Sequence, residues 1–178
     1  ETLSALPTTS NNGITGTWAP ALDNTTTTTY TFTPAASECA VSTTLTITVN
    51  PLPTAATIAS NSPVCSGDAA VFTISGDAGD TVSYSGASSG TATIGSGGTV
   101  DVTVSGVTSD ATLTLTNVND GTCDLALTGV SETVTVNPNI TPTFTAVSPI
   151  CSGETLSALP TTSNNGITGT WAPALDNT

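Results

Sequence analysis

The chain has 178 residues, of which 13 are Asp or Glu and none is Lys, Arg or His, so its formal net charge is −13. Because proteins neutralise phosphate groups with Lys and Arg, this composition argues against nucleic acids, nucleotide phosphates and anionic membrane surfaces as partners. Hydrophobic residues make up 37% of the chain and 16 glycines add to its apolar content, which argues against a disordered chain. No apolar run reaches the roughly 18 residues of a membrane span, so we expect no membrane insertion.

Short runs in which apolar residues alternate with Thr, Ser or Asp recur along the chain. A period of two is typical of strands that bury one face, and no segment has the spacing of an amphipathic helix. In chain order, the apolar members of these runs are Tyr30 and Phe32; Leu45, Ile47 and Val49; Phe72 and Ile74; Val82 and Tyr84; Val100, Val102 and Val104; Leu113 and Leu115; and Val134 and Val136.

Turn sequences separate these runs at short intervals. Asn-Gly, Asp-Gly and Gly-Gly pairs favour tight hairpin turns. Such pairs occur, in chain order, at Asn12-Gly13, Gly97-Gly98, Asp120-Gly121 and Asn165-Gly166. About five to seven short strands with frequent turns predict an all-β fold of Ig-like β-sandwich modules. A mucin-like Ser/Thr stalk without a fold is the alternative, but it has no reason to place Val, Leu and Ile at alternate positions.

The sequence contains a strong repeat and a weaker one. Residues 1–25 and 154–178 are the same 25 letters, so the period is 153 residues. Two motifs recur within this period. They are TVNP, at 48–51 and 135–138, and SPxCSG, at 62–67 and 148–153. Internal repetition of this kind indicates a stack of structural units.

The offsets between these motifs predict two alternating module types. We expect the C-terminal part of a short Ig-like module at 1–50, a complete long Ig-like module at 51–137, and the N-terminal part of the next short module at 138–178. On this interpretation the chain is a section of a longer tandem array.

Each module type carries an early cysteine, in the SPxCSG motif, and a late cysteine. Cys65 and Cys151 are the early cysteines, and Cys39 and Cys123 are the late ones. This regular placement predicts one disulfide per module, formed in an oxidising, extracytoplasmic compartment. We therefore expect Cys65 to pair with Cys123, and Cys39 and Cys151 to have partners outside this chain.

Two alternatives compete with this pairing. Bonds from Cys39 to Cys65 and from Cys123 to Cys151 would join successive modules across their linkers, but the strand ends of two modules would have to bring Cα atoms within about 7 Å. A zinc site is the other alternative, and it is disfavoured because the chain has neither His nor a CxxC pair.

Groups that could support catalysis or bind a metal are scarce. Without His and Lys, the chain lacks the base of a Ser-His, Cys-His or Ser-Lys arrangement, so we expect no enzymatic activity, no catalytic residue and no cofactor. Calcium is the more serious candidate because acidic stretches at 77–80 and at 119–124 offer hard oxygen donors. Neither stretch has the donor density of a calcium-binding loop, so we expect no metal site.

Trp18 and its copy Trp171 have two interpretations. An exposed Trp can stack on a sugar ring, as in many carbohydrate-binding modules. In a sandwich with few aromatic residues, however, a Trp on a strand more often fills the core. We therefore expect a core position for both residues.

Several segments together resemble a known repeat family. SPxCSG, GTWAP at 16–20, TTYTFTP at 28–34 and TLTITVNP at 44–51 are similar to the Ig-like repeats of giant SprB-like gliding-motility surface adhesins of Bacteroidetes. The resemblance implies export by type IX secretion and display at the cell surface as an extracellular filament that supports adhesion and gliding. It also implies O-glycosylation at Asp followed by Ser or Thr and a small or aliphatic residue. Asp80-Thr81-Val82 matches that motif, so Thr81 is a glycosylation candidate.

The resulting functional hypothesis is a structural stalk in which each module contacts neighbouring modules of the same chain. Pro51, Pro53 and Pro138 in the linkers limit bending because proline fixes φ and disfavours helix in the residue before it. The alternative hypothesis is a repeated carbohydrate- or surface-binding module, whose partner is an extracellular glycan or surface.

Overall fold

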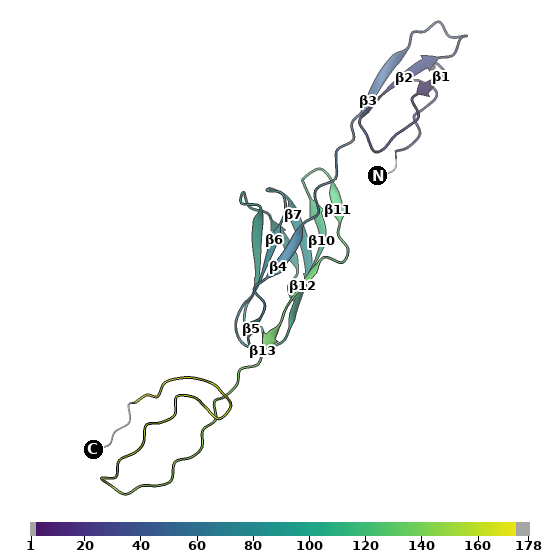
Figure 1. The fold of residues 1–178 in the computed structure, drawn as a ribbon. Coiled ribbons are helices and arrows are strands. Elements are labelled where there is room, and N and C mark those ends of the chain that lie inside the picture. The colour runs from purple at the N-terminus through teal and green to yellow at the C-terminus, as the bar shows by residue number, and fades with distance from the viewer. Residues whose placement is uncertain (1–2, 174–178) are drawn as a thin grey trace.

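A computed structural model describes residues 3–173 of the chain. These residues form strands, turns and loops, and none of them belongs to a helix that could cross a membrane. The all-β class predicted from the alternating pattern is confirmed. Figure 1 shows three segments that follow one another from the N-terminus to the C-terminus. They are named here the first segment (3–50), the central module (51–137) and the third segment (138–173).

The first segment contains a three-stranded antiparallel sheet. Its strands β1 (Gly16–Ala19), β2 (Thr28–Pro34) and β3 (Thr43–Ile47) lie in the order β1-β2-β3. Alternation along β2 buries Tyr30 and Phe32, as the sequence pattern predicts. The hydroxyl oxygen of Tyr30 accepts a hydrogen bond of 2.9 Å from the backbone N–H of Asp23, which satisfies this buried polar atom.

The central module consists of two sheets and one short parallel pair. One sheet has the order β4-β6-β9, and the other has the order β11-β10-β7-β8 with β12 also paired to β10. The short strand β13 pairs with β5 in parallel. The strands are β4 (Thr57–Ser60), β5 (Val64–Cys65), β6 (Ala70–Ser75), β7 (Thr81–Gly86), β8 (Gly90–Thr93), β9 (Thr99–Val104), β10 (Ala111–Asn119), β11 (Asp124–Ala126), β12 (Ser131–Val134) and β13 (Val136–Asn137).

The hydrophobic core of the central module lies between its two sheets. Phe72 and Ile74 on β6 are fully buried, and they belong to one cluster with Val82 on β7 and Leu113 and Leu115 on β10. Successive side chains of a strand point to opposite faces, so the Thr and Ser residues between these apolar positions face outward. The module is therefore a β-sandwich with a mainly aliphatic core.

A β-bulge in β10 shifts the phase of this alternation. The register with β7 changes between Leu115 and Asn117. Before the bulge, Leu113 and Leu115 are buried, and after it the buried residue is Val118. An extra residue in one strand moves every later side chain to the other face. The bulge thus lets this nine-residue strand keep apolar side chains in the core along its length.

The third segment forms no named strand among its described residues, 138–173. Its repeated part nevertheless has the same local structure as the first segment. An isolated bridge joins Thr162 to Thr168, and the equivalent bridge joins Thr9 to Thr15. The two copies of this sequence therefore fold into the same turn before their Trp residues.

The chain enters and leaves the central module at opposite ends. Asn50 precedes the module and contacts Cys123, which lies in the loop between β10 and β11. Asn137 ends β13 beside β5. In Figure 1, β11 lies on the side of the first segment, whereas β5 and β13 lie on the side of the third segment.

Candidate functional site

The early cysteines lie in identical turns. Cys65 accepts a 3.0 Å hydrogen bond on its carbonyl oxygen from the N–H of Asp68, and its own N–H donates to the Asp68 carboxylate at 3.3 Å. Cys151 makes the same pair of contacts with Glu154, at 3.1 and 3.0 Å. Gly67 adopts a φ of 98°, a left-handed conformation that favours glycine. The SPxCSG motif is therefore a turn that holds an exposed thiol.

The late cysteine of the central module lies in a loop closed by a carboxylate. Asp120 Oδ1 accepts hydrogen bonds of 2.7 Å from the backbone N–H groups of both Thr122 and Cys123. The hydrogen bond from the Cys123 N–H has the largest effect and that from the Thr122 N–H the next largest. Both lower the pKa of the Asp120 carboxyl from its ordinary value of 3.8. The Sγ atom of Cys123 lies 3.9 Å from the carbonyl oxygen of Asn50. This loop therefore brings a thiol to the linker that leads into the module.

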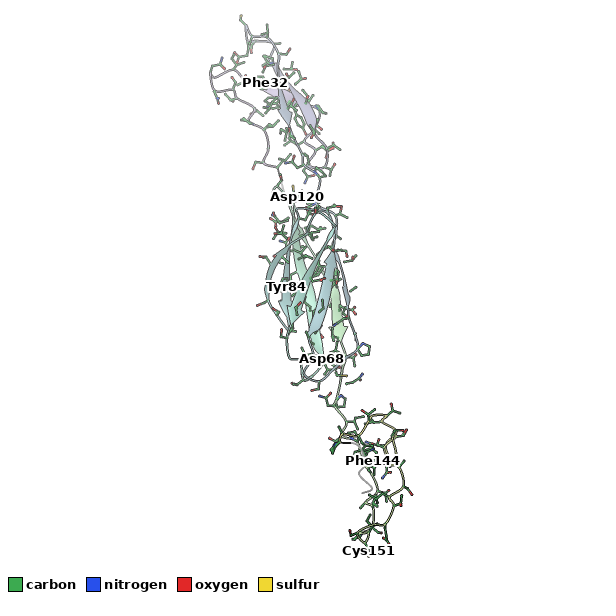
Figure 2. All side chains as sticks on the ribbon, turned by 90° about the vertical axis from the view of Figure 1, so that its left-hand side faces the viewer. Phe32, Asp68, Tyr84, Asp120, Phe144 and Cys151 are labelled. Atoms are coloured by element: carbon green, nitrogen blue, oxygen red, sulfur yellow. The ribbon has the colours of Figure 1, made fainter. Side chains whose placement is uncertain are left out.

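The predicted disulfide between Cys65 and Cys123 is absent, and all four cysteines are free thiols. Figure 2 shows Asp68, which caps the Cys65 turn, and Asp120, which caps the Cys123 loop, at opposite ends of the central module. The nine residues of β10 run between these ends and span roughly 30 Å at about 3.3 Å per residue. A disulfide joins Cα atoms less than about 7 Å apart. Early and late positions in the sequence thus correspond to opposite ends of the sandwich, which corrects the predicted pairing.

The two alternative bonds, from Cys39 to Cys65 and from Cys123 to Cys151, are absent as well. Cys39 lies in the loop between β2 and β3, and β3 then leads back to the linker, so this loop is at the end of the first segment remote from the central module. Figure 2 shows Cys151 at the end of the third segment that faces away from the central module.

Of the two acidic stretches considered for calcium, the one at 119–124 uses its carboxylate oxygens in local hydrogen bonds. In the 119–124 loop, Asp120 caps backbone N–H groups, and Asp124 Oδ1 accepts from the Nδ2 groups of Asn117 and Asn119 at 3.1 and 3.0 Å. In the other stretch, Asp77 and Asp80 are joined through a backbone hydrogen bond of 3.2 Å. Within residues 3–173, no three His, Cys, Asp or Glu residues gather as a metal site would require. Local hydrogen bonds therefore account for the carboxylates of Asp120 and Asp124.

Both Trp residues pack against phenylalanine. The ring centroids of Trp18 and Phe32 are 5.1 Å apart and those of Trp171 and Phe144 are 4.6 Å apart, with tilted rings in both cases. The indole N–H of each Trp donates to a proline carbonyl, at 2.9 Å for Trp18 and 2.8 Å for Trp171. Trp18 is half-buried, whereas Trp171 is 44% exposed, so the core position expected for both residues is wrong for Trp171. The ring contact and the satisfied indole N–H indicate a packing role for each Trp.

A hollow of about 120 Å³ lies beside Trp171 and Gly169. In the first segment, the equivalent glycine, Gly16, is covered by Phe32 of β2, because a Cβ atom on Gly16 would lie 2.5 Å from the ring. A Cβ on Gly169 would meet nothing within 4 Å. In the first segment, Phe32 of β2 occupies the position that corresponds to this hollow. A ligand is therefore not needed to explain the hollow.

Thr81, the glycosylation candidate, begins β7 on the outer face of its sheet. Its neighbours Asp80 and Val82 are buried. Thr81 is partly exposed, and its hydroxyl lies 3.4 Å from that of its cross-strand partner Thr93. Of the three residues of the motif, only the threonine therefore presents its side chain on the surface.

The contacts of the linker asparagines were not predicted from the sequence. Asn50 lies against the thiol of Cys123, and the carbonyl oxygen of Asn137 accepts a 2.9 Å hydrogen bond from the N–H of Ser66. Asn139 Nδ2 donates to the carbonyl oxygen of Ser66 at 2.8 Å, which fastens the outgoing linker to the SPxCSG turn. The only sequence signal for these positions is that TVNP and SPxCSG recur together.

Comparison with known proteins supports the sandwich. Residues 53–138 match the family model described as "Ig-like domain CHU_C associated". The central module is an Ig-like β-sandwich. No curated protein matches the sequence. A solved structure titled "Structure of surface layer protein SbsC, domains 4-9" is 16% identical, and the match covers 83% of this chain and 22% of that one with a TM-score of 0.30. The chain thus spans about a fifth of that structure's length, and a TM-score this low does not establish a shared arrangement of domains.

Proposed function

We propose that the chain is part of the structural stalk of a repetitive cell-surface filament, of the kind that supports adhesion and gliding after type IX secretion. The observation that carries this proposal is the placement of Asn50 and Asn137 at opposite ends of the central module. Modules connected in this way follow one another end to end, so each added module adds length. A structural role at the cell surface needs no catalytic group, and this agrees with the lack of His and Lys.

The short parallel pair of β5 and β13, beside the outgoing linker, suits a role under tension. In the parallel pair of β5 and β13, Val64 N–H donates to Thr135 at 3.0 Å and Ser66 N–H donates to Asn137 at 2.9 Å. A pull on the outgoing linker acts on β13 directly, and a pull on the incoming linker reaches β5 through β4, so the two strands are drawn past each other. Their hydrogen bonds are then loaded together, in shear, whereas a hairpin pulled open at one end loses its bonds one at a time.

The outer faces of the sheets in the first segment and in the central module suit a solvated filament, although the chain has no lysine. Threonine hydroxyls face each other across neighbouring strands, as in Thr29 with Thr46 and Thr112 with Thr133, both at 2.8 Å. Such cross-strand pairs stabilise a sheet without charge. The uncompensated negative charge of the chain then repels parallel copies at low salt, which keeps filaments apart.

The stalk can be tested on tandem chains of one, two and three periods, each period being residues 1–153. Small-angle scattering should show a maximum dimension that rises in equal steps with the number of periods, and a glycan array should show no specific binding. A maximum dimension that does not increase with added periods would contradict the stalk. Reproducible binding to one glycan class, weakened by a Trp18→Ala change that leaves the fold intact, would favour the carbohydrate-binding alternative.

Glycosylation of Thr81 is a further part of this proposal. Its support is the partly exposed position of Thr81 on the outer face of β7 and the match of Asp80-Thr81-Val82 to the motif that the resemblance implies. Intact-mass measurement of the natural protein, with a Thr81→Val variant and a Thr93→Val control, would test it. Mass heterogeneity that is lost only in the Thr81 variant supports the assignment, and equal loss in both variants contradicts it.

A further inference from the structure

The two junctions of the central module each show one half of a common arrangement. At the first junction, the late cysteine of the following module, Cys123, lies against the linker residue Asn50. At the second junction, the early cysteine of the preceding module, Cys65, is the register partner of the linker residue Asn137.

Asn50 and Asn137 are the same position of the TVNP motif. The two halves can therefore be combined on one linker. On a linker with a complete module on either side, the asparagine would have the early cysteine of the module before it as its strand neighbour, as Asn137 has Cys65. It would also have the thiol of the late cysteine of the module after it near its carbonyl oxygen, as Asn50 has Cys123. At neither junction do the described residues include both cysteines, which accounts for four free thiols within residues 3–173.

The cysteines of the incomplete modules fit the same rule. Cys39, a late cysteine, lies in the β2–β3 loop at the end of its segment remote from Asn50, where a preceding module would attach. Cys151, an early cysteine, lies at the end of the third segment remote from the central module, where a following module would attach. Both thiols are exposed. Both late cysteines, Cys39 and Cys123, thus lie at incoming ends, and both early cysteines, Cys65 and Cys151, lie at outgoing ends.

We propose that a disulfide forms across every module junction, between the early cysteine of one module and the late cysteine of the next. When residues are numbered 1–153 within each period, Cys65 of one period bonds to Cys39 of the next period. Cys151 of one period likewise bonds to Cys123 of the next period. Each bond converts two thiols to one disulfide, and the two electrons and two protons pass to an exchangeable disulfide outside the cytoplasm, which becomes two thiols. The linker is thereby bypassed by a covalent bond at every junction.

The test uses a tandem chain in which residues 1–153 are followed by residues 1–178. Because residues 154–178 repeat residues 1–25, this chain continues the sequence without a new join, and it contains eight cysteines. After folding with oxidised and reduced glutathione, Ellman's reagent counts free thiols on monomeric protein, and peptide mapping without reduction assigns the bonds. The 178-residue chain serves as the control.

The proposal expects four free thiols and two bonds in the tandem chain, from Cys65 of the first copy to Cys39 of the second and from Cys151 of the first copy to Cys123 of the second. The 178-residue chain should keep all four thiols free. Bonds within modules would give two free thiols and a Cys65–Cys123 peptide in each copy, and that result overturns the proposal. Eight free thiols in folded tandem protein overturn it as well.

A matched pair of variants keeps the test independent of folding yield. Cys39→Ser in the second copy should release Cys65 of the first copy and leave only the Cys151–Cys123 bond. The same Cys39→Ser change in the first copy should leave both bonds intact. Equal bond patterns in the two variants would contradict the assignment.

Discussion

Gly16 lies directly beneath the ring of Phe32, so close that a Cβ atom there would be 2.5 Å from both the ring and the carbonyl oxygen of Thr33. Only a residue without a side chain lets β1 approach β2 at this point. The same glycine occurs at position 169, in a copy of the sequence where a Cβ would meet nothing within 4 Å. Gly169 can therefore serve as a control for Gly16, because the two glycines share the same local sequence and only Gly16 lies against a phenylalanine.

Gly16→Ala should destabilise the sheet of the first segment by about 1–3 kcal/mol, because the added methyl group must displace backbone as well as the ring. Gly169→Ala in the same 178-residue chain should leave that sheet unchanged. Hydrogen-exchange protection of the β1 and β2 amides measures both effects. Equal loss of protection in the two variants would show that the contact with Phe32 is not the cause.

Leu113→Ala should lower the stability of the central module by about 2–5 kcal/mol, because Leu113 is fully buried between the sheets and its removal leaves a cavity. For a module of this size, each 1 kcal/mol lowers the melting temperature by about 4–8 °C. The neighbouring Thr114→Ala serves as a control on the outer face of the strand. Calorimetry should separate the two variants by at least 8 °C, and similar melting temperatures would argue against this core.

Asp110 supports the outgoing strand, because its Oδ1 atom accepts a 2.8 Å hydrogen bond from the N–H of Val136 in β13. Asp110→Ala removes that acceptor and should cost about 1 kcal/mol, whereas Asp110→Asn keeps a carbonyl oxygen in place. Single-molecule pulling should give a lower unfolding force for the Ala variant than for the Asn variant. Equal forces would show that β13 does not resist the load.

Acid should open the loop that contains Cys123. The carboxylate of Asp120 accepts backbone hydrogen bonds from Cys123 and Thr122, which holds its pKa below 3.8. The stabilising effect is therefore complete above pH 3.8 and is lost as the pH falls through the lower pKa of the folded state. The amide NMR signal of Thr122 should titrate with a midpoint below 3.8, and Asp120→Asn should abolish this titration. A midpoint at or above the ordinary value would contradict the hydrogen-bonded geometry.

Removal of divalent cations should leave the stability unchanged. The carboxylates of the 119–124 loop cap backbone and amide groups of the same loop. EDTA should shift the melting temperature of the chain by less than about 2 °C, which is well under 1 kcal/mol. A larger drop that calcium restores would require oxygen ligands that this loop geometry does not provide.

The strands could be predicted from the sequence because their signal is local. Phe72 and Ile74 alternate with Val71 and Thr73, and the structure buries the first pair fully in one face of β6. Val118 was not predicted as a core residue, because a bulge moves it into the core. A simple period of two does not indicate where a bulge occurs.

The positions of the cysteines required knowledge of the topology. Cys65 and Cys123 both lie at a module end, but which end depends on the direction of β10 and on the pairing of β5 with β13. These relationships join residues that are far apart in the sequence, and alternation within a run does not encode them. The repeat register located the early and late cysteines, but it did not show that Cys65 and Cys123 lie at opposite ends of the module.

The opposite placement of Asn50 and Asn137 also has a genetic consequence. Recombination between copies of the repeated 25-residue sequence removes or adds one whole period of 153 residues. Every junction in the product still joins the same two module types through the same TVNP linker, so no new interface has to evolve. The number of periods, and with it the length of the chain, can therefore differ between lineages while the modules themselves stay unchanged.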